Sequence, residues 1–134
     1  MTPQDLQIFL QENFAAWVQA LDLTVTQATP EGVTLSMPIT DSLARVGGIV
    51  SGQALAALAD TSMVLAAIAH TGEARPIATT DLHTQFLRPG VGSAIACHAK
   101  VVRAGRALIF TRASMNSADS GKPVATATAT FYVP

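Results

Sequence analysis

The sequence has few charged side chains for its length. Asp, Glu, Lys and Arg make up 13% of the 134 residues, whereas hydrophobic residues make up 49%. A solitary domain of this size normally presents a more charged surface to water. We therefore expect the chain to bury additional surface against copies of itself, as a homodimer or a dimer of dimers. The formal net charge of −1 gives no electrostatic case for a nucleic-acid partner.

Disulfides, a secretion signal and a membrane-spanning run are not expected either. The single cysteine, Cys97, cannot form an internal disulfide, so we expect a reducing cytoplasm. Residues 1–5 lack the basic start and the apolar run of a signal peptide. The longest apolar run, residues 54–69, is too short to span a membrane and contains Asp60. We therefore expect no membrane partner.

Several chemistries lack their characteristic residues. The glycine-rich phosphate loops of nucleotide-binding proteins and the Gly-x-Ser-x-Gly motif of α/β-hydrolases are absent. His70, His83 and His98 are not spaced as a set of metal ligands. Cys97 and His98 are adjacent in an expected strand, so their side chains should point to opposite faces. We predict neither a cofactor nor a metal ion.

The residues that are present predict an α+β domain. Thr2 and Pro3 mark the start of an amphipathic helix over residues 3–18. A loop over residues 41–50 leads to a long apolar helix near residues 52–70, which Gly72 should end. Strands are expected at residues 21–27, 32–39, 77–87, 93–103, 107–116 and 123–133. This order predicts one domain over residues 1–134, with a curved antiparallel sheet wrapped around the long helix.

One carboxylate, Asp60, lies in the middle of the long apolar helix. It is the only charged residue between Arg45 and Glu73. Helical spacing places it opposite the side that should face the sheet. A buried, unpaired carboxylate is a candidate general base or nucleophile. The alternative is a polar group that reaches solvent or forms a local hydrogen bond.

Glycine at the start of the same helix also has two interpretations. Gly52 either only permits entry into the helix, or lets a substrate carbonyl approach backbone N–H groups that stabilise an oxyanion. Gly52 and Asp60 are eight residues apart, which is about 12 Å along one helix. The two residues can act on one carbonyl only if two antiparallel helices meet about a twofold axis.

Three stretches carry a family resemblance: SGQALAALADT at residues 51–61, IATTDLHTQFLRP at residues 77–89 and GKPVATATATF at residues 121–131. They resemble the signature of hotdog-fold acyl-CoA thioesterases of the phenylacetyl-CoA type, from phenylacetic acid degradation. The resemblance implies a long central helix wrapped by an antiparallel sheet, and an acyl-CoA substrate with a small aryl or fatty-acyl group. It also implies active sites that are each built by two subunits.

The resemblance further implies roles for particular residues. The Gly52 N–H would hold the thioester oxygen, Asp60 of the partner would activate water or attack the carbonyl, and Thr79 would position the water. Ser51 and Gln53 replace the histidine and the second glycine of the family's His-Gly-Gly motif, and Arg45 replaces a common asparagine. Gln53 offers an amide to the carbonyl or simply faces solvent, and Thr79 is equally compatible with an ordinary strand position.

Basic residues at strand ends offer contacts for coenzyme A. Arg88, Arg103, Arg106 and Lys122 lie at expected strand ends or turns. They either hold the coenzyme A phosphates or form a solvated rim.

Two other functions are compatible with the sequence. A hotdog dehydratase or hydratase would need an acid–base pair that includes histidine, and none lies near Asp60 along the chain. A non-catalytic acyl-CoA or acyl-ligand binding protein is the stronger alternative, because Ser51 stands where the family has histidine.

Overall fold

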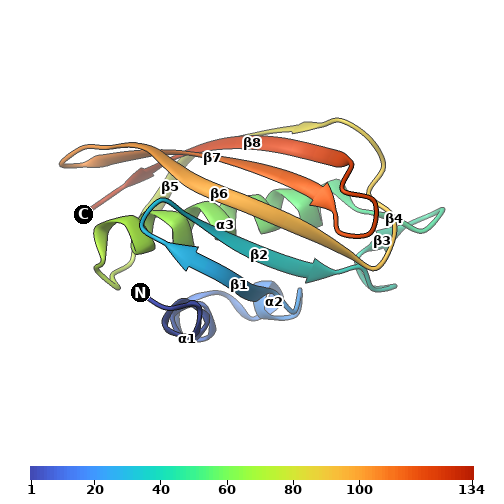
Figure 1. Ribbon diagram of the computed structural model, residues 1–134, viewed down its shortest axis with the longest axis horizontal. Coiled ribbons are helices and arrows are strands. Elements are labelled where there is room, and N and C mark those ends of the chain that lie inside the picture. Colours follow the sequence, from blue (N-terminus) through green and yellow to red (C-terminus); the bar gives the residue numbers. More distant parts are fainter.

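The long apolar helix α3 (Gly52–Thr71) lies along the inner face of a curved sheet in the computed structural model, which describes residues 1–134 (Figure 1). Its start is fixed by Ser51, whose hydroxyl accepts a hydrogen bond from the Ala54 N–H. Gly72 ends it in the left-handed region, with φ of 72°, and its N–H donates to the Ile68 carbonyl. The central helix predicted near residues 52–70 is confirmed.

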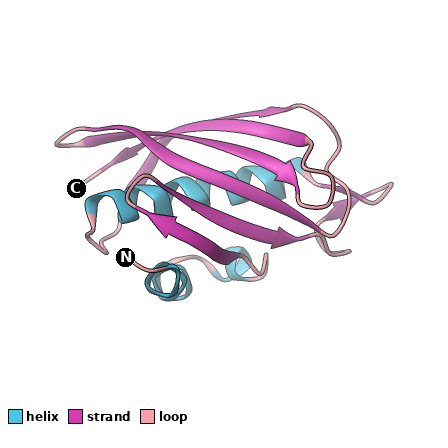
Figure 2. Ribbon diagram, viewed as in Figure 1, coloured by secondary structure: helices cyan, strands magenta, loops and turns pink.

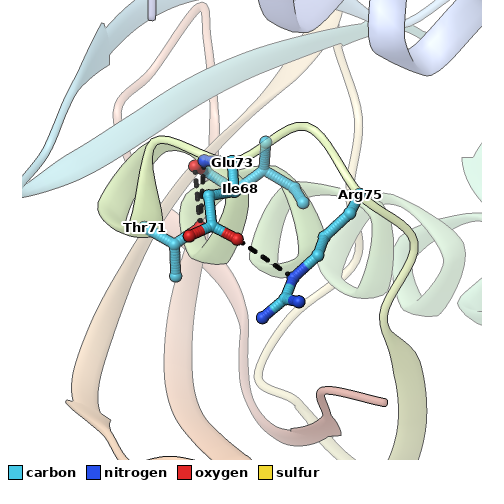
Figure 3. Close-up of polar contacts among 4 residues, drawn as sticks. All are labelled: Ile68, Thr71, Glu73 and Arg75. Atoms are coloured by element: carbon cyan, nitrogen blue, oxygen red, sulfur yellow. Dashed lines mark hydrogen bonds and ion pairs between the residues drawn. The ribbon is translucent and has the colours of Figure 1, made fainter.

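The segment after α3 is tied to the helix by short-range polar contacts (Figure 3). The Thr71 hydroxyl donates to the Ile68 carbonyl and accepts from the Glu73 N–H. Arg75 Nε lies 3.3 Å from Glu73 Oε2, and this is the only ion pair in the structure. Every other lysine and arginine therefore lacks a carboxylate within ion-pair distance.

Six strands form one antiparallel sheet in the order β1-β2-β6-β7-β8-β5. The strands are β1 (Thr24–Thr29), β2 (Gly32–Pro38), β5 (Ala78–Phe86), β6 (Ala94–Ala104), β7 (Leu108–Ser117) and β8 (Pro123–Tyr132). Figure 2 shows these long strands curving over the helix. All but β1 match the predicted ranges to within one residue at either end. Strands β1 and β5 are the two edges of the sheet.

Small residues on β8 let the sheet approach α3. Ala125, Ala127 and Ala129 are buried on its inner face. The facing side of α3 includes Leu58 and Ser62, which are also fully buried. The inner face is therefore built for close helix packing.

The predicted N-terminal helix over residues 3–18 is wrong in its extent. Helix α1 spans Pro3–Asn13, and a separate turn of helix, α2, spans Ala16–Gln19. Phe14 is extended, although its N–H still donates to the Leu10 carbonyl, and the Gln19 side-chain amide donates to the carbonyls of Leu10 and Phe14. The start is as predicted, because Thr2 and Asp5 form a capping box.

Strand β1 begins three residues later than predicted. Asp22 has a φ of 58°, in the left-handed region, which interrupts an extended run beginning at Leu21. Leu21 and Leu23 are nonetheless buried. The side chain of Gln7 on α1 bonds the Leu23 carbonyl and the Val25 N–H, so that α1 covers this edge of the sheet.

The predicted loop over residues 41–50 contains a small hairpin. Strand β3 (Ala44–Arg45) pairs with β4 (Ile49–Val50). Gly47 and Gly48, with φ of 97° and 74°, make the turn between them, which other residues adopt only with strain. This hairpin holds the chain beside the start of α3, where the Ser51 N–H donates to the Leu43 carbonyl.

The architecture is the α+β hotdog fold expected from the sequence: a long central helix, a curved antiparallel sheet around it and an N-terminal helix (Figure 1). One cluster of 31 buried residues joins the sheet, α1 and α3. By length and composition α3 could cross a membrane, but two-thirds of its most apolar window is buried inside the domain. It is therefore the core helix of the fold.

Candidate active site

Asp60 projects from the middle of α3 toward the edge strand β5. The Thr79 hydroxyl donates a hydrogen bond of 2.9 Å to Asp60 Oδ1. Burial raises the pKa of Asp60 above its ordinary value, and the hydrogen bond from Thr79 acts in the opposite direction. The structure thus brings together Asp60 and Thr79, two of the predicted site residues, within one chain.

A bulge in β5 aims Thr79 at the helix. Thr79 pairs with Phe131 and Asp81 pairs with Thr130, so Thr80 is the extra residue between them. Thr80 has no partner residue on β8, but its hydroxyl donates to the Thr130 carbonyl. The neighbouring Phe131 is fully buried on the inner face of the sheet, and the register places Thr79 on that same face.

A pocket of about 340 Å³ lies at the other part of the candidate site, at the N-terminus of α3. Its lining is mostly apolar and includes Gly52, Leu55, Phe86 and Leu87. The first N–H groups of a helix have no intrahelical acceptor, and the macrodipole is positive there. The pocket therefore offers backbone donors to a carbonyl oxygen beside an apolar wall.

Gly52 is needed for the close approach of Phe86. A Cβ atom at position 52 would lie 3.3 Å from Phe86 Cζ, which is tighter than ordinary contact. Phe86 nevertheless remains 55% exposed. A side chain at position 52 would displace this ring or obstruct the helix N-terminus.

Ser51 has a structural task that the sequence analysis did not assign. Its hydroxyl caps α3, and it is not among the residues that line the pocket. Serine is a favoured N-cap residue. Gln53, the next predicted residue, is exposed at the first turn of α3.

The predicted arginines do not gather in one chain. Arg88 lines the Gly52 pocket. The sheet register places Cys97 on β6 level with Phe86 on β5. Arg103 lies six residues further along β6, so it is about 20 Å beyond that level. Arg106 lies in the turn between β6 and β7, near the C-terminal part of α3. A single chain thus places Arg88 at one end of the sheet and the other two arginines at the opposite end.

Three residues near the candidate site were not predicted. Arg45 from β3 lines the Gly52 pocket together with Arg88, and Phe86 forms one of its walls. Thr84 lies on the same strand as Thr79 and Phe86, and its buried hydroxyl has no hydrogen-bond partner. The alternation of side chains along residues 82–86 could have placed Thr84 and Phe86 on the inner face of the sheet.

The histidines and the cysteine lie apart from this site. Cys97 is buried, and desolvation raises its pKa to about 12. His98 is exposed on the opposite face, with Nδ1 3.0 Å from the Thr34 hydroxyl. The expected opposite orientation of Cys97 and His98 is confirmed. No three His, Cys, Asp or Glu side chains are placed to hold a metal ion.

The candidate site is open along one side of the molecule. Strand β5 is a sheet edge, and nearly all of its residues are exposed. Leu82 and Phe86 on this strand are among the exposed large hydrophobic side chains. On the adjoining part of α3, Gln53 is exposed, whereas Ala57 and Asp60 are half-buried.

Comparison with known proteins agrees with this fold. The family model described as acyl-CoA thioesterase N-terminal domain matches residues 42–132, well over half of the chain. The match includes the whole of α3 and all strands from β5 to β8.

Solved structures share the fold over nearly the whole chain. A thioesterase family protein from Silicibacter pomeroyi is 24% identical with a TM-score of 0.86, over 96% of this chain and 95% of that one. A protein from Pseudomonas aeruginosa is 27% identical with a TM-score of 0.85, over 98% of each chain. Zebrafish thioesterase superfamily member 2 is 21% identical with a TM-score of 0.83, over 98% of this chain and 95% of that one. The chain therefore belongs to the acyl-CoA thioesterase family and has its hotdog fold.

Proposed function

We propose that the protein hydrolyses acyl-CoA thioesters at a site shared between two subunits of a homodimer. The observation that carries this proposal is the half-buried Asp60 carboxylate, which Thr79 holds on a side of the molecule that the chain itself leaves open. A desolvated carboxylate with a fixed orientation is suited to general-base or nucleophilic work.

Two chains are required because the candidate groups are too far apart in one. Gly52 and Asp60 are separated by about 12 Å along α3. Two α3 helices packed antiparallel about a twofold axis would place Gly52 of one beside Asp60 of the other. Each dimer would then contain two equivalent sites.

The exposed edge strand supports this assembly. Pairing β5 with its copy would extend the sheet across the dimer and would satisfy the backbone groups of an otherwise open edge. The same contact would cover Leu82 and Phe86. Because a twofold contact uses the same patch on both subunits, one surface supplies both halves.

The proposed reaction begins with the thioester carbonyl oxygen at the N-terminus of α3. The N–H groups of Gly52 and Gln53, with the helix dipole, would stabilise the negative charge that develops on this oxygen. Asp60 of the partner subunit, held through Oδ1 by its own Thr79, would present Oδ2 to the reacting carbon.

Two routes fit this geometry. As a general base, Asp60 removes a proton from water; the water oxygen bonds to the carbonyl carbon, the C–S bond breaks and the proton passes to the departing thiolate. As a nucleophile, Asp60 bonds to the carbon and expels the thiolate, and water then hydrolyses the resulting anhydride.

The pocket lining favours a small apolar acyl group. Leu55, Phe86 and Leu87 supply apolar surface beside Gly52, which suits an aryl or a fatty-acyl group and fits a substrate of the phenylacetyl-CoA type. The antiparallel dimer would also carry Arg103 and Arg106 of the partner toward the Arg88 end of the site. These three arginines would then lie together where coenzyme A phosphates are needed.

Thiol release from a panel of acyl-CoA esters tests this proposal against a ligand-binding protein. The panel should include phenylacetyl-CoA and straight-chain acyl-CoAs, each with the wild type and with Asp60→Asn. Turnover that Asp60→Asn abolishes supports hydrolysis. The alternative, non-catalytic acyl-CoA binding, is favoured by the use of Ser51 as a helix cap in place of the family's histidine. It predicts saturable binding without thiol release by either form.

A further inference from the structure

A wide hollow lies away from the candidate active site. It has a volume of about 740 Å³ and lies on the outer face of the sheet. It extends over all six strands, from the edge strand β1 to the opposite edge strand β5. This volume is in the range of small-ligand sites. Only four of its 17 lining residues are hydrophobic. Most of the residues around the hollow are thus polar or charged.

Two permanent positive charges face each other in this hollow. Lys100 on β6 is directly opposite Arg112 on β7, and the row continues through Thr128 on β8 to His83 on β5. Like charges in directly opposed positions destabilise a sheet. Glu31 also lines the hollow, but neither cation forms an ion pair with it or with any other carboxylate. The pair is thus left without a neutralising partner in the protein.

A second row, of polar side chains, runs parallel to the basic one. It crosses five strands and consists of Thr34, His98, Ser114, Thr126 and Gln85, all of which line the hollow. The two rows are two residues apart along each strand, or about 7 Å. The hollow therefore has a cationic half and a half rich in hydrogen-bonding groups.

From this arrangement we infer that the outer hollow is a second ligand site, which binds a small phosphate ester. The phosphate contacts Lys100 and Arg112, and the polar body of the ligand contacts the row that contains His98 and Ser114. Phosphate neutralises the opposed cations and accepts several charge-assisted hydrogen bonds. A second copy of the chain fits less well, because a twofold contact centred here would bring the same cations against each other.

The inferred site is independent of the proposed hydrolysis. Gly52 and Asp60 lie on the inner side of the sheet, whereas Lys100 and Arg112 lie on its outer side. Strand β5 takes part in both sites, with Thr79 and Phe86 on its inner face and His83 on its outer face. Strand β6 carries Lys100 of the hollow and Arg103 of the proposed coenzyme A contact.

Calorimetric titration of the full chain tests the inference. The probes are pyrophosphate, ADP and the uncharged adenosine, and the variants are Lys100→Gln, Arg112→Gln and the control Arg75→Gln. Arg75 is exposed in the segment after α3 and does not line the hollow. We expect saturable binding of pyrophosphate and ADP, weakened at least about tenfold by either hollow variant, the loss expected for one charge-assisted hydrogen bond. Arg75→Gln should leave binding unchanged.

Thermal unfolding distinguishes a ligand site from a merely structural role of these cations. Either hollow variant should unfold at the same or a higher temperature than the wild type, because each removes the repulsion between Lys100 and Arg112. Adding coenzyme A to the Asp60→Asn protein identifies the source of the phosphate. If coenzyme A competes with ADP, the ligand is the nucleotide part of an acyl-CoA. If it does not compete, the ligand is a free phosphate ester.

Three results would overturn the inference. They are no binding of pyrophosphate or ADP at millimolar concentration, an equal loss of affinity in Arg75→Gln, and a smaller assembly in light scattering when Lys100 or Arg112 is replaced. The last result would show that this face is a contact between copies of the chain.

Discussion

Asp60 is the residue on which the proposed chemistry depends. The change Asp60→Asn is nearly isosteric and removes the ionisable group. A positioned acid–base group typically contributes about 10²–10⁴-fold to rate, and we expect a loss of this size in thiol release from the best acyl-CoA substrate. The fold and substrate binding should be retained, because the Gly52 pocket is unchanged. Circular dichroism and binding titration check both points.

Asp81 provides the matched control for this change. It is on the same strand as Thr79, after the bulge, and its side chain is exposed. Asp81→Asn should retain the wild-type rate. A rate for Asp60→Asn within about threefold of the wild type would be far outside the expected range and would favour the ligand-binding alternative.

Asp60 should also leave a signature in the pH dependence of stability. Burial raises its pKa in the folded protein above the ordinary value of 3.8. The folded state therefore binds this proton more tightly than the unfolded state, and the associated stability is present below pH 3.8 and lost as pH rises through the folded pKa. Denaturant unfolding should show Asp60→Asn at least as stable as the wild type at neutral pH. The difference should shrink in acid, and a neutral-pH deficit for the variant would contradict the assigned cause.

Thr79 is expected to act through Asp60 as a positioning residue. Its hydrogen bond lowers the pKa of Asp60 against the effect of burial. Thr79→Val, which keeps the shape and removes the donor, should raise that pKa and shift the rising limb of the pH–rate profile to higher pH. Thr79→Ser should preserve the wild-type midpoint. An unchanged midpoint in Thr79→Val would leave Thr79 as an ordinary strand residue.

At the scale of elements, strand β5 should decide whether the protein assembles. Leu82 is 39% exposed on β5, and Leu108 is 41% exposed at the start of β7. Leu82→Lys would place a charge in the proposed dimer contact and should yield a monomer with little thioesterase activity. Leu108→Lys should remain dimeric. Light scattering at micromolar concentration measures both, and a dimeric, active Leu82→Lys would exclude β5 as the contact.

The elements that the sequence predicts well are those with local signals. Helix α3 is a long apolar run that ends at a left-handed glycine, Gly72, and turn residues separate the last four strands. After the break that follows α1, the Gln19 side chain reaches back to the Leu10 carbonyl, and no local sequence pattern indicates such a contact. The two-residue strands β3 and β4 are too short for a periodic signal.

In the candidate site too, the sequence predicts local features and does not predict contacts between distant segments. Asp60 stands out in the sequence because it is a lone charge in an apolar helix. Its contact with Thr79 depends on a bulge in β5, and the approach of Phe86 to Gly52 depends on how the sheet curves. These are consequences of tertiary packing, and so sequence reasoning named Thr79 without its partner and missed Phe86.

At the scale of the whole molecule, the two faces of the sheet have different surroundings. The inner face carries the apolar core and the candidate thioester site, and the outer face carries the polar hollow. The open side along β5 connects the two, which is where a second subunit is proposed. The low charge that suggested self-association is thus matched by a specific uncovered surface. Assembly of two dimers into a tetramer stays a prediction for light scattering.

Subunit mixing gives the most direct test of a shared site. Asp60→Asn retains Gly52, and Gly52→Val retains Asp60 while filling the space beside Phe86. Each homodimer should be inactive. In a mixed dimer, one site combines Gly52 of the first chain with Asp60 of the second and is intact, whereas the other site has lost both groups.

Random exchange makes about half of the dimers mixed, each with one of two sites intact, so activity should return to about one quarter of the wild-type level. Mixing Asp60→Asn with itself under the same unfolding and refolding conditions controls for recovery of material. If each site were built within one chain, every mixture would stay inactive, and that result would exclude the shared site while leaving the fold and the family assignment intact.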